Sequence, residues 1–264
     1  YLLPSDTVIS SMHLFRITTL GMFATFILPL RAGEIVRPLL LSRQSEISFG
    51  VSLASLLTER VLDVVTILVI FGFCLFQIQS APDWVFVGAK ALALDCALII
   101  LIMLACYIQP NLVKQAATWC ITNLIPKRFA NFSYKLSQFA EEIVVGLRAI
   151  SSFKELFLVL WYSALHWLIV AVFYQISIWA MGEFSIDPWL GLTLSTLIAL
   201  AIAVPSAPGF IGPYQVGCVL ALEGVYGFSR EFAVAYSLLI HALQTILIFI
   251  AGFYMLQKMN LSLF

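Results

Sequence analysis

Residues 29–38 read PLRAGEIVRP and lie between two apolar runs that are long enough to cross a membrane. This stretch carries Arg31, Glu34 and Arg37 at three-residue intervals, with a proline at each end. Within the next apolar run, residues 58–63 read TERVLD and add three more charges. A charge at the centre of a bilayer costs roughly 2.5–3.5 kcal/mol on insertion scales. Six charges in or beside membrane segments therefore indicate a functional role.

The composition is that of a membrane protein. Of the 264 residues, 62% are hydrophobic and 11% are charged, and the mean hydropathy is +1.02. Soluble domains carry about 25% charged residues. The apolar runs do not alternate in the way that barrel strands do, so we predict an all-α, polytopic helical membrane protein. The formal net charge is zero, which gives no bulk basic signal for nucleic acid.

Six apolar runs are predicted to form helices, at about residues 8–28, 50–79, 84–108, 153–181, 189–204 and 232–257. Residues 109–154 differ, because basic and aromatic residues are mixed there and the apolar residues recur at helical spacing. This segment predicts one or two amphipathic helices at a membrane surface. It holds six basic residues, whereas the loops at 80–83 and 182–188 hold none. We therefore expect residues 109–154 and 31–49 to face the cytoplasm.

Two segments are predicted to be interrupted or re-entrant. Residues 31–46 are too short to cross and return as two helices, and their apolar centre is unusual for a hydrophilic loop. Residues 205–213 read PSAPGFIGP, which cannot remain a regular helix, and a half-helix is expected over about 214–226. The order of run, break and run in 8–79 resembles that in 189–257. Such paired breaks indicate a transport site within one domain of two pseudo-repeat halves.

In the first break, Arg31, Glu34 and Arg37 would occupy neighbouring parts of one helix face. Pro38 disfavours helical geometry at Arg37, so we expect the face to break there. Gly33 lets a second backbone approach closely. A guanidinium suits bidentate capture of phosphate. Two interpretations stay open: an anionic head-group site, or an internal ion-pair network that fixes the hairpin.

The second charged stretch places Glu59 and Asp63 four residues apart on one helix face, with Arg60 between them. These three residues could pair with the arginines of the first break and form a near-neutral cluster across two elements. Alternatively, acids at membrane depth could take up protons and couple transport to a proton gradient.

At the second break, the half-helix would direct its N-terminal amides and positive dipole end toward an occupant of the break. A phosphate or carboxylate would suit that position, and a helix kink without a ligand is the alternative. His166 and His241 are more typical of a core than of a site. The five cysteines form no CxxC pair and indicate packing. No nucleophile, metal or nucleotide motif occurs, so we predict no enzyme activity, metal or cofactor.

Three stretches together resemble the signatures of the flippase-like family, also called the lysylphosphatidylglycerol synthase transmembrane region. They read PLRAGEIVR from residue 29, TERVLD from residue 58 and PSAPGFIG from residue 205. The resemblance covers nearly the whole chain. It implies an integral inner-membrane protein linked to lipid translocation, and some members carry an aminoacyl-transferring domain. The chain is similar to a stand-alone member without that domain.

The residues that occupy family motif positions are Arg31, Gly33, Glu34, Arg37, Glu59, Arg60, Asp63, Pro205, Pro208, Gly209 and Gly212. We add Ser206, Tyr214, Gln215 and His241 as candidates around the second break. The family usually continues as Pro-Gly-Gly with an acid a few residues later, whereas this chain has Phe210 and Gln215. We therefore expect no role for a carboxylate at this position. The family usually has one or two earlier helices, and the sequence opens on Tyr1, so we expect a piece of a longer protein.

These observations predict a protein that binds or moves an anionic phospholipid or a polyprenyl-phosphate glycolipid by alternating access. Arg31, Arg37 and residues 205–213 would hold the head group, with the arginines partly paired at rest and at least one free. The predicted partners are membrane lipids, together with a lipid-modifying enzyme or a second copy. The alternatives are a secondary transporter of a small soluble anion and a non-catalytic scaffold for a lipid-modifying enzyme.

Overall fold

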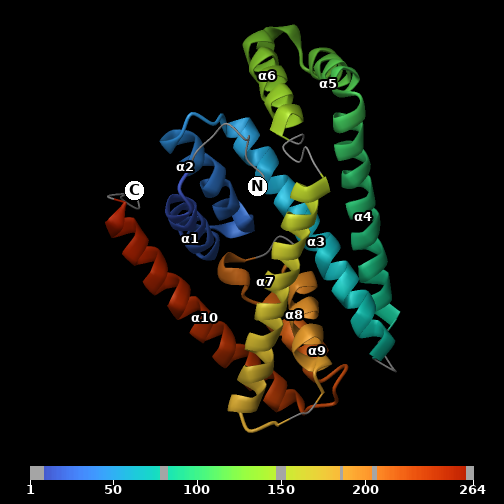
Figure 1. Cartoon of the computed structure of the whole chain (residues 1–264), viewed down its shortest axis with the longest axis vertical. Helices are drawn as coiled ribbons and strands as arrows, with labels where there is room; N and C mark the ends of the chain where they lie inside the picture. Colours follow the sequence, from blue (N-terminus) through green and yellow to red (C-terminus); the bar gives the residue numbers. More distant parts are fainter. Residues whose placement is uncertain (1–8, 78–82, 147–152, 185–186, 204–206, 260–264) are drawn as a thin grey trace.

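The computed structural model describes residues 9–77, 83–146, 153–184, 187–203 and 207–259. Within these ranges the chain is helical, with no strand (Figure 1). The elements in chain order are α1 (Ser11–Ile27), η1 (Pro29–Ile35), α2 (Val36–Gln44), α3 (Phe49–Gln77), α4 (Asp83–Ile108), α5 (Pro110–Leu124), η2 (Lys127–Phe129), α6 (Ala130–Gly146), α7 (Phe153–Ala180), α8 (Trp189–Ile202), η3 (Pro208–Phe210), α9 (Pro213–Leu222) and α10 (Arg230–Lys258).

The predicted apolar runs are confirmed as helices α1, α3, α4, α7, α8 and α10. Among the described residues, Lys154–Ala180 and Arg230–Lys258 are each long and apolar enough to cross a membrane. Their outer faces expose apolar side chains that water would disfavour, such as Ile169 on α7 and Ile250 on α10. The exposed apolar surface and the all-helical architecture agree with an integral membrane protein.

The main core lies where α7, α8, α9 and α10 meet. Leu190 and Leu194 of α8 are fully buried, and they pack in one cluster with Ile178 of α7, Leu222 of α9 and Tyr236 of α10. Helix α8 is buried along most of its length because α3, α7 and α9 surround it. In Figure 1, α10 and α4 run along opposite sides of this arrangement.

Two boundaries differ from the sequence predictions. The half-helix expected over 214–226 ends earlier, at Leu222. Beyond it the amides of Gly224 and Tyr226 bond to carbonyls five residues back, at Val219 and Ala221, instead of four, so the regular α-helix stops there. The face break expected at Arg37 is wrong: α2 starts at Val36, so Pro38 lies in the first helical turn. A proline is tolerated there, because that N–H would have no partner within the helix.

Residues 109–146 form two helices, α5 and α6, which make a hairpin at one end of the molecule (Figure 1). The chain turns by 113° between Ile100–Ile108 and Pro110–Asn123. Helix α6 packs on the start of α3, where the amide of Gly50 donates to Glu142 Oε2 at 3.0 Å and the Phe49 and Phe139 rings stack. Glu142 thus satisfies a first-turn amide of α3 that has no partner within the helix. The predicted location at a membrane surface stays a prediction.

We expect Glu142→Ala to destabilise the protein by about 0.5–2 kcal/mol, because the Gly50 amide loses its acceptor. Thermal unfolding of the detergent-solubilised protein should show a lower midpoint. Glu141→Ala is the matched control, because the Glu141 side chain is exposed one position earlier on the same helix. Equal midpoints for the two variants would contradict the capping role.

A charge cluster between two chain breaks

The first break is the short 3₁₀ helix η1, which begins two residues after the end of α1. Arg31 and Glu34 lie three residues apart on this short element. Arg31 Nε is 3.3 Å from Glu34 Oε1. Gly33 is buried against α1, where a Cβ would overlap the backbone of Thr25. The close backbone approach expected at Gly33 is therefore present.

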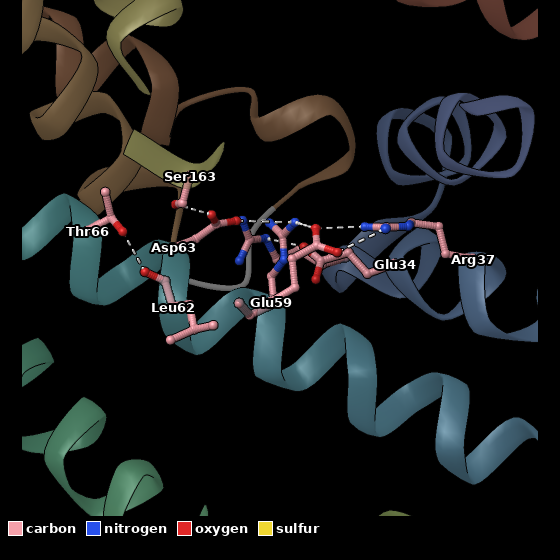
Figure 2. A network of polar contacts seen from close by, with 9 residues as sticks. Glu34, Arg37, Glu59, Leu62, Asp63, Thr66 and Ser163 are labelled. Carbon is pink, nitrogen blue, oxygen red and sulfur yellow. Dashed lines mark hydrogen bonds and ion pairs between the residues drawn. The ribbon is translucent and has the colours of Figure 1, made fainter. Parts of the chain in front are cut away.

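Arg37 joins α2 to α3 through a bidentate ion pair with Glu59. Its Nη1 and Nη2 donate to Oε1 and Oε2 of Glu59, each at 2.9 Å (Figure 2). The aliphatic part of the Arg37 side chain passes α1 at Gly21, where an added Cβ would overlap Cγ of the arginine. The predicted pairing between the two charged stretches is confirmed at this contact. Gly21 was missed from sequence, although a glycine inside an apolar helical run is itself a signal of close packing.

The remaining charges of α3 continue the network. Arg60 Nη2 donates to Glu59 Oε1 at 2.7 Å and lies 3.6 Å from Asp63 Oδ2. Asp63 in turn accepts a hydrogen bond from Ser163 of α7 at 2.7 Å. Figure 2 shows the chain of contacts running from Arg37 through Glu59 to Asp63 and Ser163. Ser163 had no sequence signal, because a single serine in an apolar helix is common.

Asp63 lies at the midpoint of α3, fourteen residues from each end. At 1.5 Å per residue, that is about 21 Å from either end of the helix. The cluster therefore lies well inside the length of the helix. Pairing explains how so many charges are tolerated there, since a buried charge is stable only with a partner.

The second break, between α8 and α9, is held by His241 of α10. Three contacts link it to the break: the Gly212 amide donates to Gln215 Oε1 at 2.8 Å, Gln215 Nε2 lies 2.9 Å from His241 Nδ1, and His241 Nε2 lies 2.7 Å from the Gly209 carbonyl. The Gly209 carbonyl can only accept, so Nε2 carries the proton and Nδ1 accepts from the amide of Gln215. The Tyr214 ring stacks on His241 with centroids 4.4 Å apart.

This network explains one of the two departures from the family pattern. Gln215 accepts from Gly212 with its oxygen and donates to His241 with its nitrogen. A carboxylate could fill only the first role, because it has no hydrogen to donate. His241 was expected to be a core histidine; it is buried, and it also fixes the backbone of the break.

The two breaks contact each other. The Arg31 guanidinium lies over the Phe210 ring, 5.4 Å from its centroid, and Arg31 Nη1 is 3.5 Å from the carbonyl of Ala203 at the end of α8. Phe26 of α1 packs edge-on against the same ring, with centroids 5.6 Å apart. Whether the breaks face each other was open from the sequence, and these contacts settle the question.

Backbone strain coincides with this contact. Arg31 and Phe210 have φ +58° and +61°, and they are the non-glycine residues with positive φ in the described chain. Such conformations cost of order 1–3 kcal/mol each and cluster at functional sites. The positive φ at Phe210 also explains why the family pattern usually has glycine at this position.

The three arginines of the cluster differ in how fully their N–H donors are paired. Arg37 uses both terminal nitrogens on Glu59, whereas Arg31 has one ion-pair contact at 3.3 Å and one hydrogen bond at 3.5 Å. The Nε atoms of Arg31 and Arg60 are buried and make no hydrogen bond within the described residues; that of Arg31 has only its 3.3 Å ion-pair contact with Glu34. Buried donors without acceptors are rare in native structures, and a bound ligand is one of their explanations.

The remaining candidates are placed as follows. Pro208, Gly209, Gly212 and Tyr214 belong to the second break or to the first turn of α9. Pro205 and Ser206 lie outside the described residues. Both halves have the element order helix, 3₁₀ turn, short helix and long helix, in α1–α3 and in α8–α10. The pseudo-repeat stays a prediction.

A bundle of apolar helices, with two breaks in contact and a paired charge cluster that extends from the first break to α3, defines an integral membrane protein with a polar cluster among its helices. The family model described as "Lysylphosphatidylglycerol synthase TM region" matches residues 1–252. The chain therefore belongs to this family. Comparison with the curated proteins and with the solved structures gives no match.

We expect Arg37→Ala to destabilise the protein by on the order of 2–3 kcal/mol, somewhat less than the loss for a fully buried pair, because Glu59 is left without its bidentate partner. Adding Glu59→Gln should restore part of the loss, since it removes a carboxylate that keeps Arg60 as a partner but has lost Arg37. Thermal unfolding of wild type, both single variants and the double variant measures the coupling. Arg43→Ala, an exposed change at the end of α2, is the control. If the stability losses of the two single variants simply add up in the double variant, the ion pair between Arg37 and Glu59 does not stabilise the protein.

We expect Gln215→Glu to destabilise the second break more at mildly alkaline than at mildly acidic pH. A carboxylate facing His241 Nδ1 has no hydrogen to share, and lowering the pH supplies one. Gln215→Ala should lose stability equally at both pH values, because no titrating group is introduced. Thermal midpoints of the two variants in matched buffers test this. The same pH dependence in both variants would contradict the assigned hydrogen bonds.

Proposed function

We propose that this protein binds the phosphate of a membrane lipid head group between the two breaks and moves the lipid across the membrane. The observation that carries the proposal is the position of Arg31. It has uncommitted donors, and it stands in contact with both breaks at once. A guanidinium with free donors is suited to a phosphate. The family to which the chain belongs suggests the same class of activity.

The cluster would lower the barrier to moving a head group. An unassisted ion pays an idealised cost of order 20 kcal/mol on entering a medium of low dielectric constant. A phosphate that meets Arg31 exchanges its hydration for charge-assisted hydrogen bonds. The acyl chains remain in the lipid, whose contact with the outer faces of the helices is apolar. The head group alone would need to pass between the breaks.

Arg31 and Arg37 have different roles in this proposal. Arg37 is clamped between α1 and α3 by Gly21 and Glu59, so it holds the break in place. Arg31 is the residue that contacts the head group. Loss of activity in an Arg37 variant would therefore report on structure, whereas Arg31 is the diagnostic position. The family resemblance further suggests the cytoplasmic membrane as its location.

Alternating access would require the breaks to part and meet again. The contact between Arg31 and Phe210 is the one that must open for a head group to pass between η1 and η3. Both residues hold a positive φ in the closed arrangement. Parting would let either backbone relax, which reduces the free-energy difference between the closed and open arrangements.

The test is lipid movement in proteoliposomes containing phospholipids with fluorescent acyl chains, with a membrane-impermeant quencher outside. Wild type should expose inner-leaflet probes to the quencher faster than empty vesicles. Arg31→Gln should lower that rate about tenfold or more, the loss expected for a hydrogen bond to a charged group. Arg43→Gln is the control, since it removes an exposed arginine outside the cluster.

Wild-type rates in the Arg31→Gln variant would overturn the assignment of the head-group contact. Rates of wild type equal to those of empty vesicles would overturn lipid movement itself. Uptake of soluble phosphate without lipid movement would favour a transporter of a soluble anion. Equal thermal midpoints of the two arginine variants would show that a slow rate is not a folding defect.

A further inference from the structure

The charges around the breaks balance. Three guanidinium groups and three carboxylates form the cluster: Arg31, Arg37, Arg60, Glu34, Glu59 and Asp63. Arg31 pairs with Glu34, Arg37 pairs with Glu59, and Arg60 pairs with both Glu59 and Asp63. The six groups therefore interact mainly with one another, and their sum is zero.

A phosphate changes this balance. A head group with one negative charge would leave the site at minus one, about halfway along α3. A charge in such surroundings is costly unless a partner of opposite sign accompanies it. An incoming phosphate that takes donors from Arg31 also weakens the pair that neutralises Glu34. The site then needs a positive charge close to Glu34.

Glu34 is the acid best placed to accept a new cation. Its ion-pair contact with Arg31 is 3.3 Å, longer than the 2.7–2.9 Å typical of charge-assisted hydrogen bonds. Glu59, by contrast, pairs with two arginines, and Asp63 is held by Arg60 and Ser163. Among the three acids of the cluster, Glu34 is thus the least firmly held.

We propose that the lipid carried at this site has a zwitterionic head group, with an ammonium group a few bonds from its phosphate. The phosphate binds Arg31 and the ammonium binds Glu34, so that the head group replaces one ion pair with two. This inference rests on the proposed function. The ammonium of a primary amine brings three donors, whereas a quaternary ammonium brings none, so a primary amine fits Glu34 better.

The position of the pair on the 3₁₀ helix supports this exchange. Arg31 and Glu34 lie three residues apart on the same short element and are already in contact, so both side chains can turn toward one ligand without moving a helix. The other pairs of the cluster link different elements or are tied to a third residue. Opening the Arg31–Glu34 contact therefore leaves the rest of the network intact.

The experiment compares three phospholipids labelled on the acyl chain: phosphatidylethanolamine, phosphatidylcholine and phosphatidylglycerol. Each is present in trace amount in the same host vesicles with the full chain. We expect wild type to move phosphatidylethanolamine about tenfold faster than the other two, the gain from one hydrogen bond between charged groups. Glu34→Gln should bring the ratio of ethanolamine to glycerol lipid close to one. Glu46→Gln is the control, because Glu46 is exposed and lies just after α2.

A second measurement uses wild type alone, so it does not depend on the folding of a variant. Native mass spectrometry of the detergent-solubilised protein in an equimolar mixture of the three lipids should show mainly ethanolamine lipid bound. Soluble O-phosphoethanolamine in excess should compete weakly, because it has no acyl chains.

The possible results are distinguishable. If phosphatidylglycerol moves as fast as phosphatidylethanolamine, or moves only with a proton or sodium gradient, the zwitterionic substrate is excluded while lipid movement stands. If Glu34→Gln keeps the preference, Glu34 is not the ammonium ligand and the inference fails. If none of the lipids moves faster than in empty vesicles, the proposed function fails first. Uptake of phosphoethanolamine alone would overturn both.

Discussion

The bidentate ion pair between Arg37 and Glu59 is the contact on which the rest of the site depends. It joins α2 to α3, directly after the short helix η1 that leads from α1 into α2. Gly21 makes the contact sterically possible, because the arginine stem crosses α1 at that position. Arg31, within η1 and six residues before Arg37, contacts the second break at Phe210 and the end of α8 at Ala203.

The second break is organised by a different kind of chemistry. Its ties to α10 are neutral hydrogen bonds through Gln215 and His241, each with a single consistent assignment of donor and acceptor. One break is thus built from charges and the other from neutral polar groups. They meet at Arg31 and Phe210, the two strained residues, where a cation lies on an aromatic face. The ion pairs thus belong to the first break and α3, and the neutral hydrogen bonds to the second break and α10.

Hydropathy predicted the helices because apolar runs of membrane length have few alternatives. The breaks were predictable from proline, glycine and charge, and the pairing of the two charged stretches followed from the cost of burying charge alone. The features that could not be predicted depend on tertiary contacts. They are the packing of the Arg37 side chain on Gly21, the hydrogen bond from Ser163 to Asp63 and the hydrogen bond from His241 to the Gly209 carbonyl. The break predicted at Arg37 from Pro38 was wrong, because the effect of a proline depends on whether it lies within the first turn of a helix.

The balance of charges has an electrical consequence. A membrane potential does work of about 2.3 kcal/mol on each elementary charge that crosses 100 mV. The six charged groups of the cluster sum to zero, so a displacement of the cluster as a unit transfers no net charge. Voltage therefore exerts no net force on that movement. A site assembled in this way would work equally well in a polarised and in a depolarised membrane.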